Sequence, residues 1–303
     1  MSRIKRIAIT LTAILFTFSN SFAEEIPTRL DVPSEAVVVR EILNYNYVLN
    51  ETKNDNPLKQ FDIIIKLSLK GANNTSIKKM FGFGKKEILA TIIRSGETIV
   101  VPIRPKDLVD IKVSDMFSYV ATITAIKDDN SFVGLSHKAG LGETIITDDL
   151  VFDSTIYSID SLKAEKIKDS DIYGLSPIFL GKSIGEVVKY TDYGIKGKID
   201  IQECSFYDMD IAHPKVGQAH IYCKSPITNK FKFYDIDITH VEDDISYIQV
   251  KDNELLENYG GLVKGMSGSA IIQDGKLVGG ARSILNGKAD TCRITNIKTM
   301  LKD

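Results

Sequence analysis

Apolar and polar residues alternate in short runs along most of the chain, and this two-residue period is typical of β-strands with one buried face. Gly, Asn, Asp or Lys bound each run, as expected for strands joined by turns. The runs lie at residues 63–69, 89–93, 98–103, 119–125, 195–201, 219–222, 231–238, 245–250, 270–272 and 277–278. The pattern therefore predicts a mainly β protein.

Local turn and cap signals add detail to this pattern. Asp274-Gly275 lies between two apolar runs and Asn286-Gly287 follows another, so each pair predicts a tight β-hairpin. Helices are expected to be few and short. They are predicted at residues 75–80, 184–189 and 254–258, the last of them ending at a Gly-Gly pair.

The amino-terminal segment has the pattern of a secretory signal peptide. Three cations within residues 3–6 precede an apolar run over residues 7–18 that only Thr interrupts, and small residues lead to a cleavage site after Ala23. A membrane span needs about 20 apolar residues, so an uncleaved anchor is the less favoured alternative. No second run of spanning length follows. We expect an exported, periplasmic or extracellular protein whose mature chain begins near Glu24 and has no integral membrane span.

Composition and charge exclude several classes of protein. The 303 residues are 43% apolar and 26% charged, the balance of a globular protein and not of a disordered one. Lys and Arg number 38 against 40 Asp and Glu, and no long basic run is present, so nucleic acid is not an expected partner. The length indicates about two domains. We predict their boundary at residues 107–111, where two β-rich blocks meet.

The three cysteines, Cys204, Cys223 and Cys292, are an odd number. Because an exported protein can keep a disulfide, the sequence allows two alternatives: a Cys204–Cys223 disulfide bond, or three buried free thiols. No cysteine has the spacing of a zinc site, and no metal is expected.

The segment most informative about chemistry reads Gly-Met-Ser-Gly-Ser-Ala at residues 265–270. A serine nucleophile needs a turn that exposes its Oγ, small neighbours that admit a substrate, and N–H groups that stabilise the oxyanion. Ser267 has this setting, and the N–H groups of Gly265 and Ser267 are the candidate oxyanion hole. The alternative is a Gly/Ser-rich turn without chemistry.

A serine nucleophile also needs a general base. His137 is the candidate, because a predicted strand ends there among small residues at 132–137. The other histidines, His213, His220 and His240, lack this setting and are expected at the surface or in strands. A third, acidic group should orient the imidazole, and spacing alone does not select it among 40 carboxylates.

Residues 260–280 resemble the serine-peptidase signature of the SpoIVB peptidase family, peptidase family S55. In that family, Gly-Gly-Ile-Val-Gln-Gly-Met-Ser-Gly-Ser-Pro precedes a strand, a hairpin and a second strand. Residues 132–137, residues 184–186 with 194–197, and residues 299–301 are similar to other family segments in the same order. The resemblance implies a trypsin-like double β-barrel serine peptidase domain that needs no cofactor.

The resemblance also implies roles for three residues. The family places an Asp fifteen residues before the catalytic Ser in an Asp-x-x-Leu-Leu context, and Asp252 stands there in this chain. By this carry-over, Ser267 is the nucleophile, His137 the general base and Asp252 the orienting acid. Asp252 could also cap the helix predicted at residues 254–258.

The amino-terminal block, residues 28–107, resembles more weakly the small α+β PDZ domain that precedes the peptidase in this family. Residues 61–64, 75–80 and 90–98 carry this resemblance, with Phe61 where Gly is usual. The chain would thus divide into a signal peptide at residues 1–23, a PDZ-like domain, and a peptidase domain at residues 111–303.

The favoured hypothesis is an exported serine endopeptidase that hydrolyses peptide bonds in a restricted set of protein partners, its own chain being one candidate. Departures from the family at Ser136, Lys138 and Ala270 keep open a catalytically inactive homologue that acts as a PDZ-like protein-binding or regulatory module. A third hypothesis, an envelope-associated structural β protein, requires that His137 and Ser267 lie far apart. The sequence does not indicate the oligomeric state.

Overall fold

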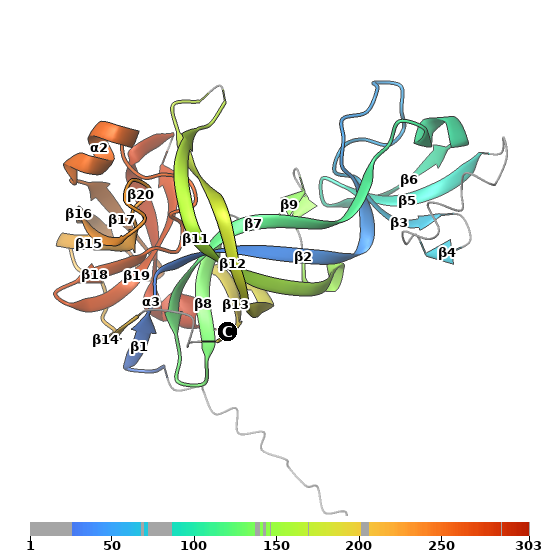
Figure 1. Ribbon diagram of the computed structural model, residues 1–303. Helices are drawn as coiled ribbons and strands as arrows, with labels where there is room; N and C mark the ends of the chain where they lie inside the picture. Colours follow the sequence, from blue (N-terminus) through green and yellow to red (C-terminus); the bar gives the residue numbers. More distant parts are fainter. Residues whose placement is uncertain are drawn as a thin grey trace, which may run out of the picture.

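The computed structural model describes residues 26–67, 70–71, 87–136, 140–141, 144–145, 147–168, 170–200, 206–285 and 287–302. The protein is mainly β, with two barrels next to each other and a smaller lobe of strands extending from the first of them (Figure 1). The predicted fold class, a double β-barrel, is confirmed. Residues 1–23, the predicted signal peptide, lie outside the described residues.

The second barrel in the chain is a closed ring of six antiparallel strands. In ring order these are β15 (Gly217–Lys224), β16 (Phe231–Val241), β17 (Ile245–Val250), β20 (Lys288–Asn296), β19 (Lys276–Leu285) and β18 (Ala270–Gln273). Both predicted hairpins are confirmed, since Gln273 pairs with Lys276 and Leu285 with Lys288. Asn286 itself lies outside the described residues. Alternating side chains from these strands, mainly Ile with Val, Ala, Cys and Tyr, fill the interior.

The first barrel also closes through six strands. They are β2 (Glu35–Val48), β7 (Val113–Ile126), β8 (Ser131–Ser136), β13 (Gly194–Ile199), β12 (Tyr173–Thr191) and β11 (Val151–Lys166). Pairing of β2 with both β11 and β7 completes the ring. Three short elements lie between β8 and β11: the paired strands β9 (Gly140–Leu141) and β10 (Thr144–Ile145), and η2 (Asp148–Leu150).

An apolar seam joins the two barrels. Its side chains come from β1 (Arg29–Val32), β7 and β8 on one side and from β15, β18 and β19 on the other, with α3 (Ile297–Leu301) packed against them. β1 also pairs with β14 (Tyr207–Asp210). Ser34, buried in the seam, donates a hydrogen bond to the Tyr222 carbonyl and accepts one from Ala270 N at 2.9 Å. The chain before the first barrel is thereby bonded to the start of β18.

The third lobe is an excursion between β2 and β7. It comprises β3 (Ile63–Leu67), β4 (Lys70–Gly71), β5 (Ile88–Arg94), β6 (Glu97–Ile103) and η1 (Pro105–Leu108) around its own apolar cluster. β2 belongs to the predicted PDZ-like block, residues 28–107, but its pairing with β7 closes the first barrel. A cut at residues 107–111 therefore does not separate two sheets, and the PDZ-like assignment stays a prediction.

The helix predictions had three different outcomes. The helix at 254–258 is confirmed as α2 (Asn253–Tyr259), and residues 75–80 lie outside the described residues. The helix at 184–189 is wrong, because these residues belong to β12. The β12 ladder is irregular on both sides of this segment, so Ile184 and Val187 are both buried three positions apart. A β-bulge inserts one residue into the strand alternation and so produces a helix-like spacing.

Cys223 and Cys292 are free, buried thiols, and Cys204 lies outside the described residues. Cys223 is therefore not part of a disulfide bond. None of the helices in the described part of the chain is long and apolar enough to cross a membrane.

Candidate active site

Ser267 lies on a tight turn that leads into β18. Met266 N donates to Val263 O at 3.0 Å and Ser269 N to Met266 O at 3.0 Å, so the turn is folded on itself. It is also bonded to β19, where Gly268 N donates to Ala281 O at 2.6 Å. The turn therefore holds Ser267 in a fixed place at the edge of the second barrel.

Two glycines of the predicted motif make this turn possible. Gly265 has φ +103° and Gly268 has φ +96°, a backbone region that residues with a side chain rarely adopt. A Cβ atom at position 268 would lie 2.6 Å from Thr122 O and 3.1 Å from Leu135 N. The turn therefore packs directly against the backbone of β7 and β8 in the first barrel.

Polar side chains of β7 bind the same turn across the seam. Thr124 Oγ1 donates to Gly268 O at 2.7 Å, and Thr122 Oγ1 donates to Gly265 O at 3.4 Å. Both threonines are buried. They were not among the sequence-predicted site residues, although buried hydroxyls within the apolar run at 119–125 are the signal that could have found them.

His137, the predicted base, lies outside the described residues. The preceding strand, β8, ends at Ser136. The backbone nitrogen of Leu135, in the same strand, lies beside Gly268. The strand that leads to His137 thus runs against the turn that carries Ser267.

The Ser267 side chain is half-buried, and its Oγ donates to the Arg282 carbonyl at 2.9 Å. A small cavity of about 20 Å³ lies beside it, lined mostly by apolar side chains such as Leu262, Met266 and Ile284. Cys292 also lines this cavity, but burial raises the pKa of its thiol to about 12. Because the thiolate is the reactive form of cysteine, this burial disfavours Cys292 as a nucleophile.

Asp252 is the N-cap of α2. Its Oδ1 accepts hydrogen bonds from Glu254 N at 2.9 Å and Leu255 N at 3.3 Å, as predicted from the sequence. Both capping bonds go to one oxygen, so Oδ2 can still accept a bond from another donor. α2 lies at the rim of the second barrel (Figure 1).

The remaining histidines lie on or near the second barrel. His220 Nδ1 lies 3.0 Å from an Asp235 oxygen, and His240 Nε2 lies 3.5 Å from a Glu242 oxygen, both at exposed strand positions. His213 is exposed before β15, and its Nδ1 lies 3.0 Å from the Pro214 carbonyl oxygen. The structure thus places His220 and His240 in strands at the surface, as predicted.

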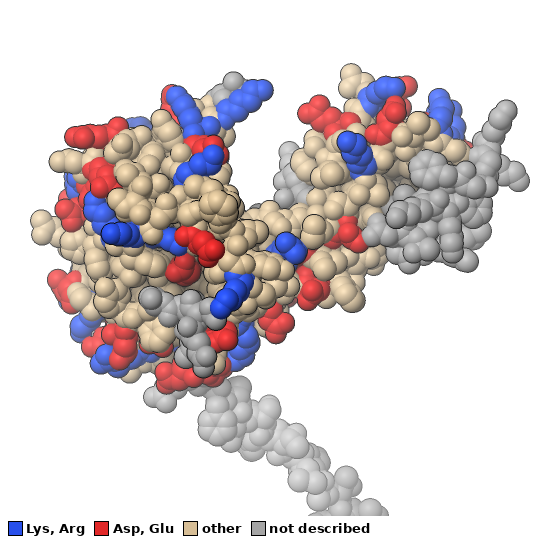
Figure 2. Space-filling model, viewed as in Figure 1, with Lys and Arg blue, Asp and Glu red and all other residues tan. Residues whose placement is uncertain are grey.

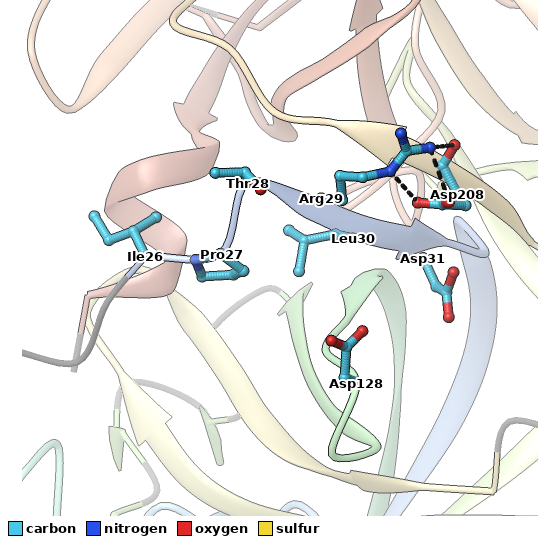
Figure 3. Close-up of a pocket in the computed structure, with 8 residues that line it drawn as sticks. All are labelled: Ile26, Pro27, Thr28, Arg29, Leu30, Asp31, Asp128 and Asp208. Carbon is cyan, nitrogen blue, oxygen red and sulfur yellow. Dashed lines mark hydrogen bonds and ion pairs between the residues drawn. The ribbon is translucent and has the colours of Figure 1, made fainter.

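A larger pocket lies away from this turn, at the start of the described chain (Figure 3). Arg29 is bonded there to Asp208, with Nη2 to Oδ2 at 2.8 Å, while Asp31 and Asp128 also line the pocket. Among the described residues that line this pocket, none is a predicted site residue. Within the described residues, no three His, Cys, Asp or Glu side chains cluster as metal ligands would. On the face shown in Figure 2, cations and anions are interspersed, in line with the small net charge.

Comparison with known protein families identifies the family of this double-barrel chain. The model of the SpoIVB peptidase S55 family matches residues 108–301, which include every strand of the two barrels except β2. The chain belongs to the SpoIVB peptidase S55 family. No curated protein matches the chain. The Ser267 turn, the whole of β8 and α2 all lie within the matched region.

Membership of the SpoIVB peptidase S55 family makes this protein a serine peptidase and its substrates proteins or peptides. Family membership does not by itself assign catalytic roles to individual residues. The structure brings the Ser267 turn against the strand that leads to His137 and places Asp252 at a helix cap.

Proposed function

We propose that this protein is an exported serine endopeptidase that cuts internal peptide bonds in a restricted set of protein partners, by an acyl-enzyme mechanism. The observation that supports this most is the Ser267 turn, which has positive φ at Gly265 and Gly268 and packs at Gly268 against Leu135, near the end of β8. The signal-peptide pattern of residues 1–23 supports export.

In the proposed mechanism, Ser267 Oγ attacks the carbonyl carbon of the scissile bond while His137 accepts the hydroxyl proton. The N–H groups of Gly265 and Ser267 stabilise the oxyanion of the tetrahedral intermediate. His137 then donates the proton to the leaving amine, and a water molecule hydrolyses the acyl-enzyme by the same steps. Asp252 orients the imidazole and stabilises its cation.

Asp252 has two proposed tasks, and one substitution separates them. Ser is about as good an N-cap as Asp, so Asp252→Ser should keep the free energy of unfolding within about 0.5 kcal/mol of the wild type. Loss of the carboxylate should lower kcat by about 10²–10⁴-fold, because the imidazole loses its orienting partner. Urea unfolding and steady-state kinetics measure the two effects. If Asp252→Ser kept the wild-type kcat, Asp252 would act only as the N-cap of α2 and would have no role in orienting His137.

A mixture of synthetic peptides tests the proposed function. The full-length protein should cut a minority of the peptides at internal bonds, as mass spectrometry of the products would show. Prior reaction with a fluorophosphonate should abolish these cuts, and a metal chelator should leave them unchanged, because triad chemistry uses no metal. Products that lack only terminal residues, or cuts that persist after phosphonylation, would contradict a serine endopeptidase.

A further inference from the structure

A two-stranded arm reaches from the first barrel to the second. In their barrel portions, β11 pairs with β2 over residues 151–158 and β12 pairs with β13 over residues 185–191. Beyond the barrel, β11 and β12 pair with each other as far as Lys166 and Tyr173. Figure 1 shows this arm rising beside the second barrel and α2. An isolated two-stranded ribbon is only marginally stable, so the position of the arm depends on its contacts with the second barrel.

The end of the arm is bonded to the residue that precedes the proposed oxyanion hole. Leu175 N donates to Lys264 O at 2.7 Å, and Lys264 N donates to Tyr173 O at 2.8 Å. These two bonds make a parallel bridge between Gly174 and Lys264. Three residues further along the chain stands Ser267.

Side-chain packing reinforces this bridge. The Tyr173 ring meets the Tyr259 ring of α2 edge to face, with centroids 5.2 Å apart. Leu175 covers Gly265, since a Cβ atom at position 265 would lie 2.9 Å from Leu175 Cβ. Tyr173 and Leu175 both pack on the core of the second barrel. The arm is therefore anchored at its far end by apolar contact as well as by backbone bonds.

The hydrogen bond that Lys264 O accepts from Leu175 N fixes the direction in which the Gly265 N–H points. The carbonyl of Lys264 and the N–H of Gly265 belong to one planar, trans peptide unit, so they point in opposite directions. While Lys264 O faces the arm, Gly265 N–H faces away from it. Rotation of this peptide plane would break the 2.7 Å bond from Leu175 N.

We infer that the Tyr173–Lys264–Leu175 bridge positions the oxyanion hole, and that the arm of the first barrel thereby controls the reactivity of Ser267 on the second. Leu175 is a positioning residue in this inference, since it acts through the peptide unit of Gly265. The inference rests on the proposed function of Ser267.

Leu175→Pro tests the bridge directly, because proline has no N–H to donate to Lys264 O. The rate of Ser267 phosphonylation at saturating fluorophosphonate should fall by about 10²-fold or more, the usual cost of losing an oxyanion-hole donor. The probe concentration that gives half the maximal rate should change by less than about 3-fold. Leu175→Ala keeps the N–H and should lose no more than about 10-fold. A folded Leu175→Pro protein with the wild-type rate would overturn the inference.

If Leu175→Pro does not fold, a second set of variants tests whether the arm positions the oxyanion hole. Tyr173→Ala combined with Leu175→Ala removes the packing at the end of the arm and should lower the maximal rate by about 10-fold. Tyr173→Phe keeps the ring and should match the wild type. An unchanged rate in the double variant would overturn the inference while leaving the proposed function intact. A wild-type protein that is not labelled at all would instead contradict the proposed function.

Discussion

Ser267→Ala should abolish peptide hydrolysis. Alanine cannot form the acyl-enzyme, and the turn that holds position 267 is made by backbone bonds and by glycines, so the variant should fold as the wild type does. The turnover of a cleaved peptide should fall by at least about 10⁴-fold. The measurement is kcat for that peptide, with the midpoint of urea unfolding measured in parallel.

Ser269→Ala is the matched control for this loss. Ser269 lies two residues further along the same turn, but it is only 1% exposed and so cannot meet a substrate. Its substitution should leave turnover within about 10-fold of the wild type. If Ser267→Ala retained activity, or if Ser269→Ala alone removed it, the assignment of the nucleophile to Ser267 would be wrong.

Gly268→Ala should destabilise the protein by about 3–5 kcal/mol, near the upper end for single substitutions. Its Cβ would lie 2.6 Å from Thr122 O and 2.8 Å from Thr122 Cβ, and its φ of +96° is already unfavourable for alanine. The two barrels would have to separate locally to admit the methyl group. Urea unfolding of the variant and the wild type measures the loss of unfolding free energy.

Gly275→Ala separates the clash from the backbone conformation. Gly275 also has positive φ, +73°, but nothing lies within 4 Å of a Cβ atom there. This variant should lose only about 1–2 kcal/mol, the cost of the left-handed conformation itself. Equal losses in the two variants would mean that the seam is looser than the structure indicates.

Sequence periodicity predicted the second barrel well because its strands have one buried and one exposed face. Residues 245–250 alternate between buried and partly exposed positions and form β17 with the predicted ends. Asp274-Gly275 marked the β18–β19 hairpin because few other pairs adopt positive φ at both turn residues. Local chemistry was sufficient for these elements.

The first barrel was harder to predict because its closure depends on distant segments. β2 and β7 pair at Val37 and Ala121, and nothing local to either strand specifies this partner. In the arm, residues 177–180 of β12 are all exposed, so no alternation marks them as a strand. The PDZ-like resemblance likewise took residues 28–107 as one block, although β2 is shared with the barrel.

The candidate site was predictable where a contiguous motif specified it. Gly265, Ser267 and Gly268 form the turn that the sequence suggested, with positive φ at both glycines. The contacts that hold this turn, from Thr124 and Leu175, come from residues at least 89 positions away in the sequence, so the residues next to the motif do not indicate them. Such contacts follow from the packing of the two barrels.

Mapping a covalent adduct tests the central claim most directly. A fluorophosphonate forms a bond from phosphorus to the attacking oxygen as fluoride leaves, so the modified residue is the nucleophile. Mass spectrometry of the labelled, digested protein should find a single phosphonyl group on Ser267, with Ser269 unmodified. An unlabelled protein, or an adduct on another residue with Ser267 intact, would contradict the account.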